Sequence, residues 1–355
     1  MEYSLRNITA LIVLFTLFTN CKTIDTNPVY TESKIEKKID SIFTSLNQNG
    51  KFNGNVLVAK KDKIIYNKGF GFSNGDKQLL LKATDKFNIG SIYKEIPAIA
   101  IMQLEEKGFL RLNDPIKKHL KNLPKWSSEI SILNLLQYTS GLPKINWRKH
   151  EMINDKTLMN DLSEILRLEF IPGRNYLYTN YSPFLLSKIV ENVTGEKFTE
   201  YVFKSILKPL KLNQSTFNES FPYKNRGSMA ISFNGDFVED SPPFTIKSSL
   251  FLFSTTTQDL FKLLKGIHTL NLINEKSLNT IGKTADLNIE DMESPLGQVQ
   301  FKNTKIAEHN HHGTSGNYEC IISRNNLQNT TIVILTNNKN ENIHSIKDSL
   351  QELLQ

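Results

Sequence analysis

Strand-like segments lie near both ends of this 355-residue chain, while its long middle part has mostly helical spacing. Apolar runs at 56–59 and 64–66 flank the charged turn Lys60-Lys61-Asp62-Lys63, and further runs lie at 320–323 and 331–336. The simplest way to bury all these strands is one antiparallel sheet built from both termini and flanked by helices. The sequence therefore predicts an α/β fold of the α+β type, with a mostly helical subdomain inserted at about 115–264.

A serine and a lysine three residues apart, Ser91 and Lys94, form the first chemical motif, S-x-x-K. Residues 87–90 are typical of a strand end and tight turn, and 96–107 of a helix. Residues at i and i+3 share one helix face, so Lys94 can reach the Ser91 oxygen. Because serine needs a neighbouring base to become a nucleophile, the pair predicts nucleophilic catalysis at a helix N-terminus.

Composition is that of a globular protein, with 39% hydrophobic and 22% charged residues. The net charge of +7 comes from lysines spread along the chain, without a dense basic run. This pattern indicates a solvated surface and gives no support for a nucleic-acid partner.

The N-terminus is predicted to be a targeting segment. Arg6 precedes an apolar stretch at 8–18 that is too short to span a bilayer comfortably, and Phe18-Thr19-Asn20-Cys21 resembles a bacterial lipobox. We expect a signal peptide at 1–20, a lipidated Cys21 with a polar tether at 21–36, and the folded domain at 37–355. The alternative is a plain secretory signal with an incidental cysteine. With Cys21 lipidated, Cys320 is the only other thiol and no intramolecular disulfide can form.

Tyr178 and Asn180 form a second candidate, Y-x-N. A phenol has a reference pKa near ~10 and acts as a base only where a cation such as Lys94 stabilises the phenolate. Asn180 offers a donor and an acceptor that could hold Lys94 and a substrate amide. The alternative interpretation is an aromatic residue in an ordinary loop.

The third candidate is the segment His311-His312-Gly313-Thr314, directly before the strand at 320. Glycine at position 313 lets backbone approach closely, and an edge strand here could pair with an extended acyl chain. The nearby His309 invites a metal interpretation. Alternate residues of a strand project to opposite faces, and no convincing third-party carboxylate accompanies the histidines, so we expect no metal.

Taken in order, S-x-x-K, Y-x-N and H-x-G resemble the serine β-lactamase and penicillin-binding protein superfamily. The resemblance is to its class C-like branch, with D-alanyl-D-alanine carboxypeptidases and esterases. It extends over about 40–355: residues 52–59 resemble the opening strand, 102–108 and 112–115 the nucleophile helix and exit turn, and 135–143 the leucine-rich turn ending in T-S-G-L. A β-lactamase/transpeptidase-like fold is thus implied.

The resemblance also implies roles at the matched positions. Ser91 would form an acyl-enzyme, Lys94 and Tyr178 would share the acid–base work, and Asn180 would position the acyl part. Backbone N–H groups of Ser91 and Thr314 would form the oxyanion hole next to Gly313. His311 stands where class C β-lactamases carry lysine, which favours the carboxypeptidase and esterase branches over β-lactam turnover. No cofactor is implied.

Three departures from the family pattern concern the cleft. Pro97 lies inside the predicted nucleophile helix, where an interior proline costs about 3 kcal/mol or more. Either it kinks the helix just beyond Lys94, or it lies close enough to the first turn to be tolerated. Asn317 follows Gly316 where the family usually has glycine, and asparagine tolerates a left-handed backbone. Leu250-Phe251 replaces the family's two glycines before S-T, which narrows the cleft or gives it an apolar wall.

Two functions remain open from the sequence. The first is a serine hydrolase of the bacterial envelope, anchored to a membrane by lipid, acting on small ester, amide or D-alanyl peptide substrates. The second is a catalytically silent, lipid-anchored protein that binds peptidoglycan or a partner in the same cleft.

Overall fold

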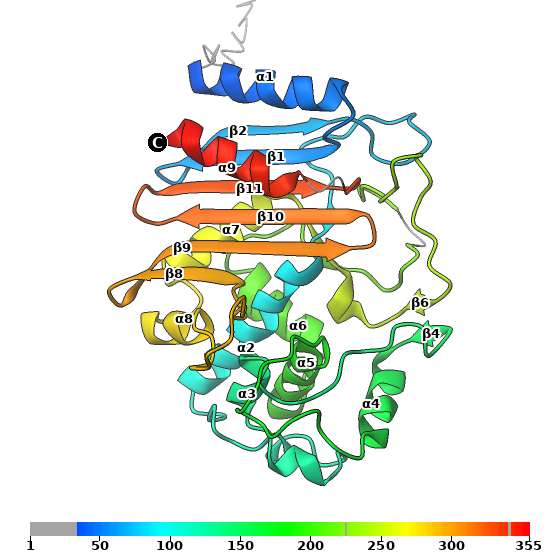
Figure 1. Cartoon of the computed structure of the whole chain (residues 1–355), viewed down its shortest axis with the longest axis vertical. Helices are drawn as coiled ribbons and strands as arrows, with labels where there is room; N and C mark the ends of the chain where they lie inside the picture. The colour runs from blue at the N-terminus through cyan, green and yellow to red at the C-terminus, as the bar shows by residue number, and fades with distance from the viewer. Residues whose placement is uncertain (1–33, 224–225, 340–341) are drawn as a thin grey trace, which may run out of the picture.

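The predicted sheet is present: six antiparallel strands from the two ends of the chain lie side by side in the computed structural model, which describes residues 34–223, 226–339 and 342–355 (Figure 1). Their order is β2-β1-β11-β10-β9-β8. The strands are β1 (Gly54–Lys60), β2 (Lys63–Phe70), β8 (Gln298–Lys302), β9 (Lys305–Ser315), β10 (Tyr318–Asn325) and β11 (Thr330–Thr336). The predicted signal peptide, Cys21 and most of the tether lie outside the described residues.

The β1–β2 connection confirms the predicted charged hairpin. Lys61 and Asp62 take φ values of 52° and 57°, as a two-residue turn that follows the sheet twist requires. Asp62 also accepts a hydrogen bond of 2.7 Å from the Arg324 guanidinium on β10, which joins this turn to the neighbouring end of the sheet.

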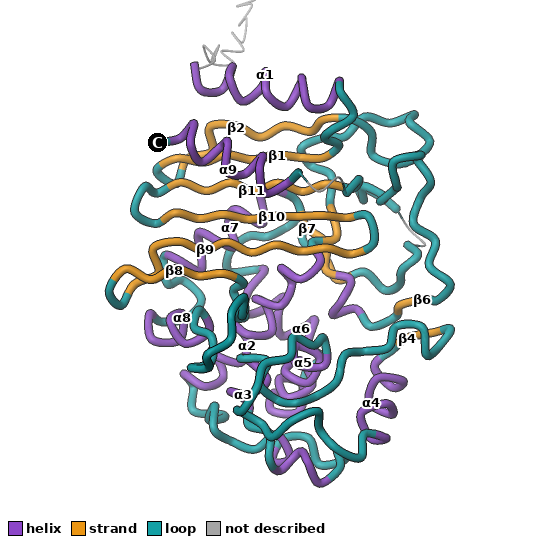
Figure 2. The backbone as a smooth tube through the Cα atoms, viewed as in Figure 1, coloured by secondary structure: helices purple, strands orange, loops and turns teal. Residues whose placement is uncertain are grey.

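Helices cover both faces of the sheet. On one face lie α1 (Lys34–Gln48) and α9 (Ile343–Leu354), whose Ile39, Phe43 and Leu350 are fully buried against the strands. On the other face lie α7 (Thr257–His268) and α2 (Glu95–Glu106), which belong to the larger core shared with the rest of the helices. Figure 2 shows these helices gathered below and behind the strands.

The inserted subdomain is less helical than the sequence pattern indicates. It contains α3 (Ile132–Leu136), α4 (Asp155–Glu164), α5 (Tyr181–Thr194) and α6 (Phe198–Val202), with the short turns η2 (Ile116–Lys118), η3 (Lys125–Ser128) and η4 (Phe203–Leu207). From 208 to 256 the described residues form only η5 (Ser249–Leu252) and the short strands β5 (Thr216–Phe217), β6 (Thr245–Ile246) and β7 (Phe253–Thr255). These strands pair with β3 (Phe87–Asn88) and β4 (Met152–Ile153). Prolines and glycines between 222 and 243 explain the lack of helix there.

The remaining helix, α8 (Glu275–Ile281), packs against α2. Among the residues that the structure describes, no helix is both long and apolar enough to cross a bilayer.

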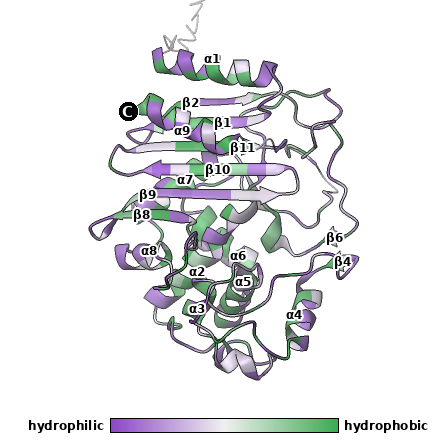
Figure 3. Cartoon of the chain, in the orientation of Figure 1, coloured by the Kyte–Doolittle hydropathy of each residue, from purple (hydrophilic) through white to green (hydrophobic). Residues whose placement is uncertain are grey.

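Strand β9 is unusual for an interior strand because its sequence is polar. Figure 3 colours most of it hydrophilic, in contrast to the apolar centre of β11. Even so, His309, His311 and Gly313 are buried on the face of β9 that meets η1 (Gly90–Lys94), the turn preceding α2. Buried polar groups must find hydrogen-bond partners, so this contact has to be a polar one.

Candidate active site

Ser91 and Lys94 lie together in η1, a 3-10 turn that continues directly into α2. Side chains at i and i+3 eclipse one another in 3-10 geometry, and Lys94 Nζ lies 3.0 Å from Ser91 Oγ. Lys94 is only 3% exposed. The predicted contact is therefore present, with the amine enclosed by protein.

Pro97 does not disturb this arrangement. It is the third residue of α2, where the 3-10 turn gives way to α-helix. Proline is tolerated in a first helical turn because those N–H groups lack partners at the standard i−4 spacing. The expected penalty of an interior proline therefore does not arise.

Tyr178 comes from the loop before α5 and is held by the leucine-rich turn. Backbone bonds join Leu177 N to Tyr138 O at 2.9 Å and Gly173 N to Thr139 O at 2.8 Å, while the Tyr138 and Tyr178 rings lie 4.7 Å apart. The sequence showed this turn as a family feature only. In the structure it has a physical purpose, because it fixes the tyrosine over Lys94.

Electrostatics around the motif favour Lys94 over Tyr178 as the first proton acceptor. Burial lowers the pKa of Lys94 to about 7, although the Glu293 carboxylate opposes that shift. Burial raises the pKa of Tyr178 far above that of a free phenol, an effect that its interaction with Ser91 only partly offsets. The Tyr178 hydroxyl is buried and makes no hydrogen bond of normal geometry with any described residue.

The Lys94 pKa predicts the pH dependence of acylation. A lysine acts as a base only when neutral, so kcat/KM should rise as pH increases and level off above about 7. Below that point we expect about a tenfold loss per pH unit. Initial rates with a neutral activated ester between acid and mildly basic pH test this; an inflection near the unperturbed lysine value would contradict it.

Asn180 takes a different partner from the one we expected. It lies at the start of α5, and its Oδ1 accepts a hydrogen bond of 3.3 Å from the Tyr93 hydroxyl; no hydrogen bond joins it to Lys94. Lys94 instead lies near the faces of two rings, 4.7 Å from the centre of Tyr93 and 4.8 Å from that of Tyr178. Tyr93 thus links the first two motifs, which sequence reasoning did not foresee.

The third motif meets the first through backbone contact. A Cβ atom on Gly313 would lie 2.1 Å from Ile89 O and 2.9 Å from Ser91 N, and one on Gly90 would lie 2.4 Å from Thr314 N. Only glycine fits at both positions. This close approach brings the η1 turn, which carries the Ser91 N–H, against β9, which carries the Thr314 N–H. An oxyanion hole requires two backbone N–H groups held close together in this way.

The turn after this motif also differs from our expectation. Gly316, with φ of 58°, supplies the left-handed conformation of the β9–β10 hairpin, so Asn317 does not have to. Asn317 instead binds Asp240 through its backbone N–H at 2.7 Å and through its side-chain amide. The turn is therefore held by the loop that carries Asp240.

A cavity of about 230 Å³ opens at the motifs. Its polar side contains Ser91, Lys94 and Asn180. Three other predicted site residues, Tyr178, His311 and Gly313, are not part of its wall. The complete lining is Gly90, Ser91, Tyr93, Lys94, Trp147, Asn180, Phe244, Ile246, Phe251, Thr314, Ser315 and Gly316. Phe251 forms the predicted apolar wall, its ring packed edge-on against Trp147 at 5.2 Å.

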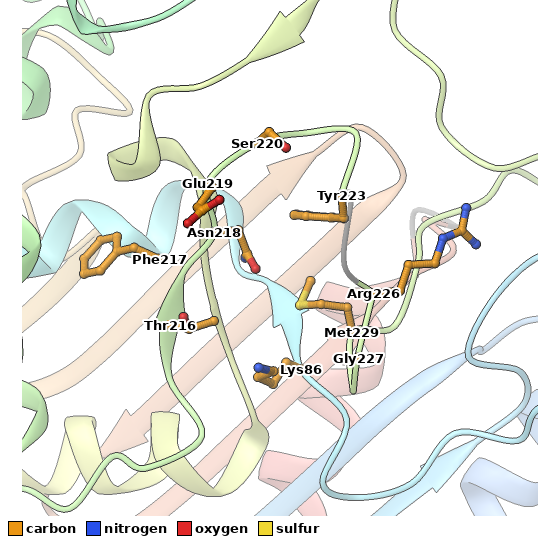
Figure 4. Close-up of a pocket in the computed structure, with 10 residues that line it drawn as sticks. All are labelled: Lys86, Thr216, Phe217, Asn218, Glu219, Ser220, Tyr223, Arg226, Gly227 and Met229. Atoms are coloured by element: carbon orange, nitrogen blue, oxygen red, sulfur yellow. The ribbon is translucent and has the colours of Figure 1, made fainter.

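A second, larger cavity of about 400 Å³ lies beside β5, lined by Lys86, Glu219, Tyr223 and their neighbours (Figure 4). It contains no residue of the three motifs. Arg226 at its rim is already paired with Glu239 at 2.7 Å. Without a nucleophile next to a base, this cavity offers no comparable chemistry.

The structure supplies the carboxylate that the sequence did not show near the histidines. Glu95, the residue after Lys94, is fully buried, and its Oε1 lies 3.1 Å from His309 Nε2 and 2.8 Å from His311 Nδ1. His312 lies on the opposite face and pairs with Glu319 at 3.0 Å. Glutamate and two histidines at these distances could in principle hold a divalent metal.

A metal would need a lone pair on His309 Nε2, which the surrounding hydrogen bonds do not provide. Asn326 Nδ2 donates to His268 Nδ1, so His268 must donate through Nε2 to His309 Nδ1. His309 can then carry its proton only on Nε2, where it donates to Glu95. The cluster is therefore a hydrogen-bonded network.

Comparison with known proteins agrees with this geometry. A profile of the family described as Beta-lactamase matches residues 39–354 of the chain. Protein flp of Staphylococcus aureus (strain MW2) is 28% identical over 335 residues, which are 89% of this chain and 66% of that protein. The chain thus spans just under two thirds of the length of this relative.

Two solved structures have the same fold. A penicillin-binding protein homologue from Pyrococcus abyssi, described as octameric, superposes with a TM-score of 0.76 and 22% identity over 90% of this chain and 77% of its own. A class C beta-lactamase superposes with a TM-score of 0.74 and 19% identity over 91% of this chain and 96% of its own. At these identities the two structures support the fold alone.

Proposed function

The chain belongs to the beta-lactamase family, within the serine hydrolase superfamily, and from this premise we propose that it forms an acyl-enzyme at Ser91 with small ester or amide substrates. The observation that carries the proposal is the 3.0 Å contact between Ser91 Oγ and a buried Lys94 whose pKa is lowered to about 7. A nucleophile and a base poised near neutral pH are what acyl transfer needs.

Each remaining group has a part in this reaction. Lys94 removes the Ser91 proton as the oxygen attacks the carbonyl carbon, and the N–H groups of Ser91 and Thr314 stabilise the oxyanion. Tyr178, still protonated, donates to the leaving group. Water then attacks the acyl-enzyme with the same pair acting in reverse and releases the acid.

The cavity favours a small, apolar acyl group. Its volume is about 230 Å³, and Trp147, Phe244 and Phe251 form one wall. Lys94 is the only charged side chain in the lining. Ester hydrolysis therefore fits better than cleavage of a large muropeptide, although D-alanyl peptides of small size remain within the proposed substrate class.

The predicted location extends the proposal. A signal peptide and lipidated Cys21 would place this active site in the bacterial envelope, where peptidoglycan and acylated polymers are available. Mass spectrometry of the membrane-extracted protein tests the anchor through the mass of its N-terminal peptide.

The catalytic proposal is tested by intact-protein mass spectrometry after incubation with a fluorophosphonate and, separately, with a penicillin. We expect a covalent adduct in the wild type and none in Ser91→Ala. A lasting penicillin adduct would favour the carboxypeptidase type, and fluorophosphonate labelling alone the esterase type. If neither reagent labels the folded protein, the result favours the alternative function, a catalytically silent binding protein.

A further inference from the structure

A buried chain of hydrogen bonds leads from the end of the sheet to the residue after the catalytic lysine. Arg324 Nε donates to Asn326 Oδ1 at 2.9 Å, which fixes the orientation of that amide. Asn326 Nδ2 then donates to His268 Nδ1 at 3.0 Å and to Ile306 O at 2.9 Å. A guanidinium can only donate hydrogen bonds. Arg324 therefore determines which atom donates and which accepts in every later bond of this network.

The direction determines which nitrogen of each imidazole carries a proton. His268 donates through Nε2 to His309 Nδ1 at 3.0 Å, and His309 donates through Nε2 to Glu95 Oε1 at 3.1 Å. Burial, with the Arg324 guanidinium nearby, lowers the pKa of His268 well below its usual range, so that ring stays neutral. His309 accepts at Nδ1 and therefore cannot hold a second proton either.

Glu95 is left as a fully buried charge that needs a counter-ion. Burial alone would raise the pKa of Glu95, but the two hydrogen bonds that its Oε1 accepts from His309 and His311 favour the ionised form. Its Oε2 atom is buried without a hydrogen-bond partner. A buried, ionised carboxylate is stable only next to a positive group.

His311 is the one remaining candidate for that charge within the network. Its Nδ1 lies 2.8 Å from Glu95 Oε1, the shorter of the two contacts. Lys94 points to Ser91 and makes no ion pair with Glu95. The other groups around the ring are Ile322 on β10, apolar and opposite it in register, and Gly297, whose added Cβ would lie 2.8 Å from His311 Cγ.

We propose that Glu95 is a positioning residue that holds His311 as an imidazolium, with Nδ1–H bonded to Glu95 and Nε2–H left on the opposite side of the ring. The inference rests on the proposed function only for its effect on the reaction. His311 lies two residues before Gly313, which packs on the Ser91 backbone, so the network also fixes β9 against η1. A fixed positive charge three residues before Thr314 on the same strand would stabilise the developing negative charge.

The charge state can be measured without any activity. Side-chain nitrogen NMR of the full-length protein with labelled histidine, at about one pH unit above the usual histidine pKa near 6.5, distinguishes imidazolium from either neutral form. We expect a doubly protonated ring whose signals vanish in His311→Asn. A His311 that is neutral at this pH would overturn the proposal.

The positioning effect is tested with Glu95→Gln. Glutamine keeps the size of the side chain and one oxygen acceptor, and it removes the negative charge of the carboxylate. The wild type should show a single rising pH profile for 4-nitrophenyl acetate hydrolysis. In Glu95→Gln we expect a bell-shaped profile with about a tenfold lower rate on the alkaline side, because His311 no longer has the carboxylate that holds its second proton.

Glu319→Gln is the matched control, since it removes the Glu–His312 pair from the other face of the same strands. It should keep the wild-type profile. A folded Glu95→Gln with an unchanged profile would overturn the positioning role. Should that variant not fold, the NMR result on the wild type decides the proposal. Absence of Ser91 labelling would count against the proposed function alone.

Discussion

Replacing Lys94 by methionine should reduce the rate of Ser91 acylation by about 10²–10⁴-fold while making the protein more stable. The activity falls because Ser91 loses its only base within hydrogen-bond distance among the described residues. The loss should appear in kcat, with KM changing little, since the amine acts in the chemical step. Burst or single-turnover kinetics with an activated ester measure it.

The gain in stability follows from the depressed pKa of Lys94. The folded value is about 7 and the unfolded one 10.5, so the folded state binds the proton more weakly. The penalty is full below about pH 7 and disappears as pH rises towards 10.5, and it amounts to on the order of 5 kcal/mol. Thermal melts should therefore show the largest gain at neutral and acid pH.

Lys107→Met is the matched control, because this exposed lysine follows the end of the same helix. It should change neither rate nor stability measurably. If Lys94→Met retained wild-type acylation, the role of Lys94 as base would be refuted. If it lost stability instead, the view of Lys94 as a strained, desolvated group would be wrong.

Replacing Gly313 by alanine should cost about 10²–10³-fold in kcat, the usual effect of losing one oxyanion-hole donor. The new Cβ would lie 2.1 Å from Ile89 O and 2.9 Å from Ser91 N, both backbone atoms that cannot swing away. Strand β9 and the η1 turn must therefore separate. Because Thr314 moves with the strand, its N–H loses alignment with that of Ser91.

Gly235→Ala provides the comparison, since nothing lies within 4 Å of its added Cβ and its φ is not left-handed. That variant should behave as the wild type. Fluorophosphonate labelling, which needs the same oxyanion stabilisation, should slow in Gly313→Ala alone. Equal rates in the two variants would show that the β9 contact does not form the hole.

Much of the fold follows from local pattern. The charged hairpin at Lys61-Asp62, the strands near both ends and the apolar face of α9 obey simple periodicities that a short window reveals. The segment at 208–256 does not obey such a periodicity, because its apolar residues are buried by neighbours distant in the sequence. Phe251, for example, packs against Trp147 and Tyr93. Periodicity cannot show such contacts.

The candidate site also has features that local spacing predicts and features that it does not. Spacing alone placed Lys94 beside Ser91, because three residues in a helical turn determine that distance. Asn180 was assigned the wrong partner, since Tyr93 competes for its oxygen through a contact between separate loops. The pairing of the histidines with a carboxylate was missed for the same reason.

The sequence by itself determined the contact between Ser91 and Lys94, the order of the three motifs and the sheet shared by both termini, because each depends on local spacing or strand pattern. Only the tertiary structure decided the protonation of the site. Burial lowers the pKa of Lys94, and the packing of β9 on η1 brings Glu95, which directly follows that turn, to His309 and His311 across more than half the chain. Desolvation and charge pairing depend on what surrounds a group in space, which no local pattern records.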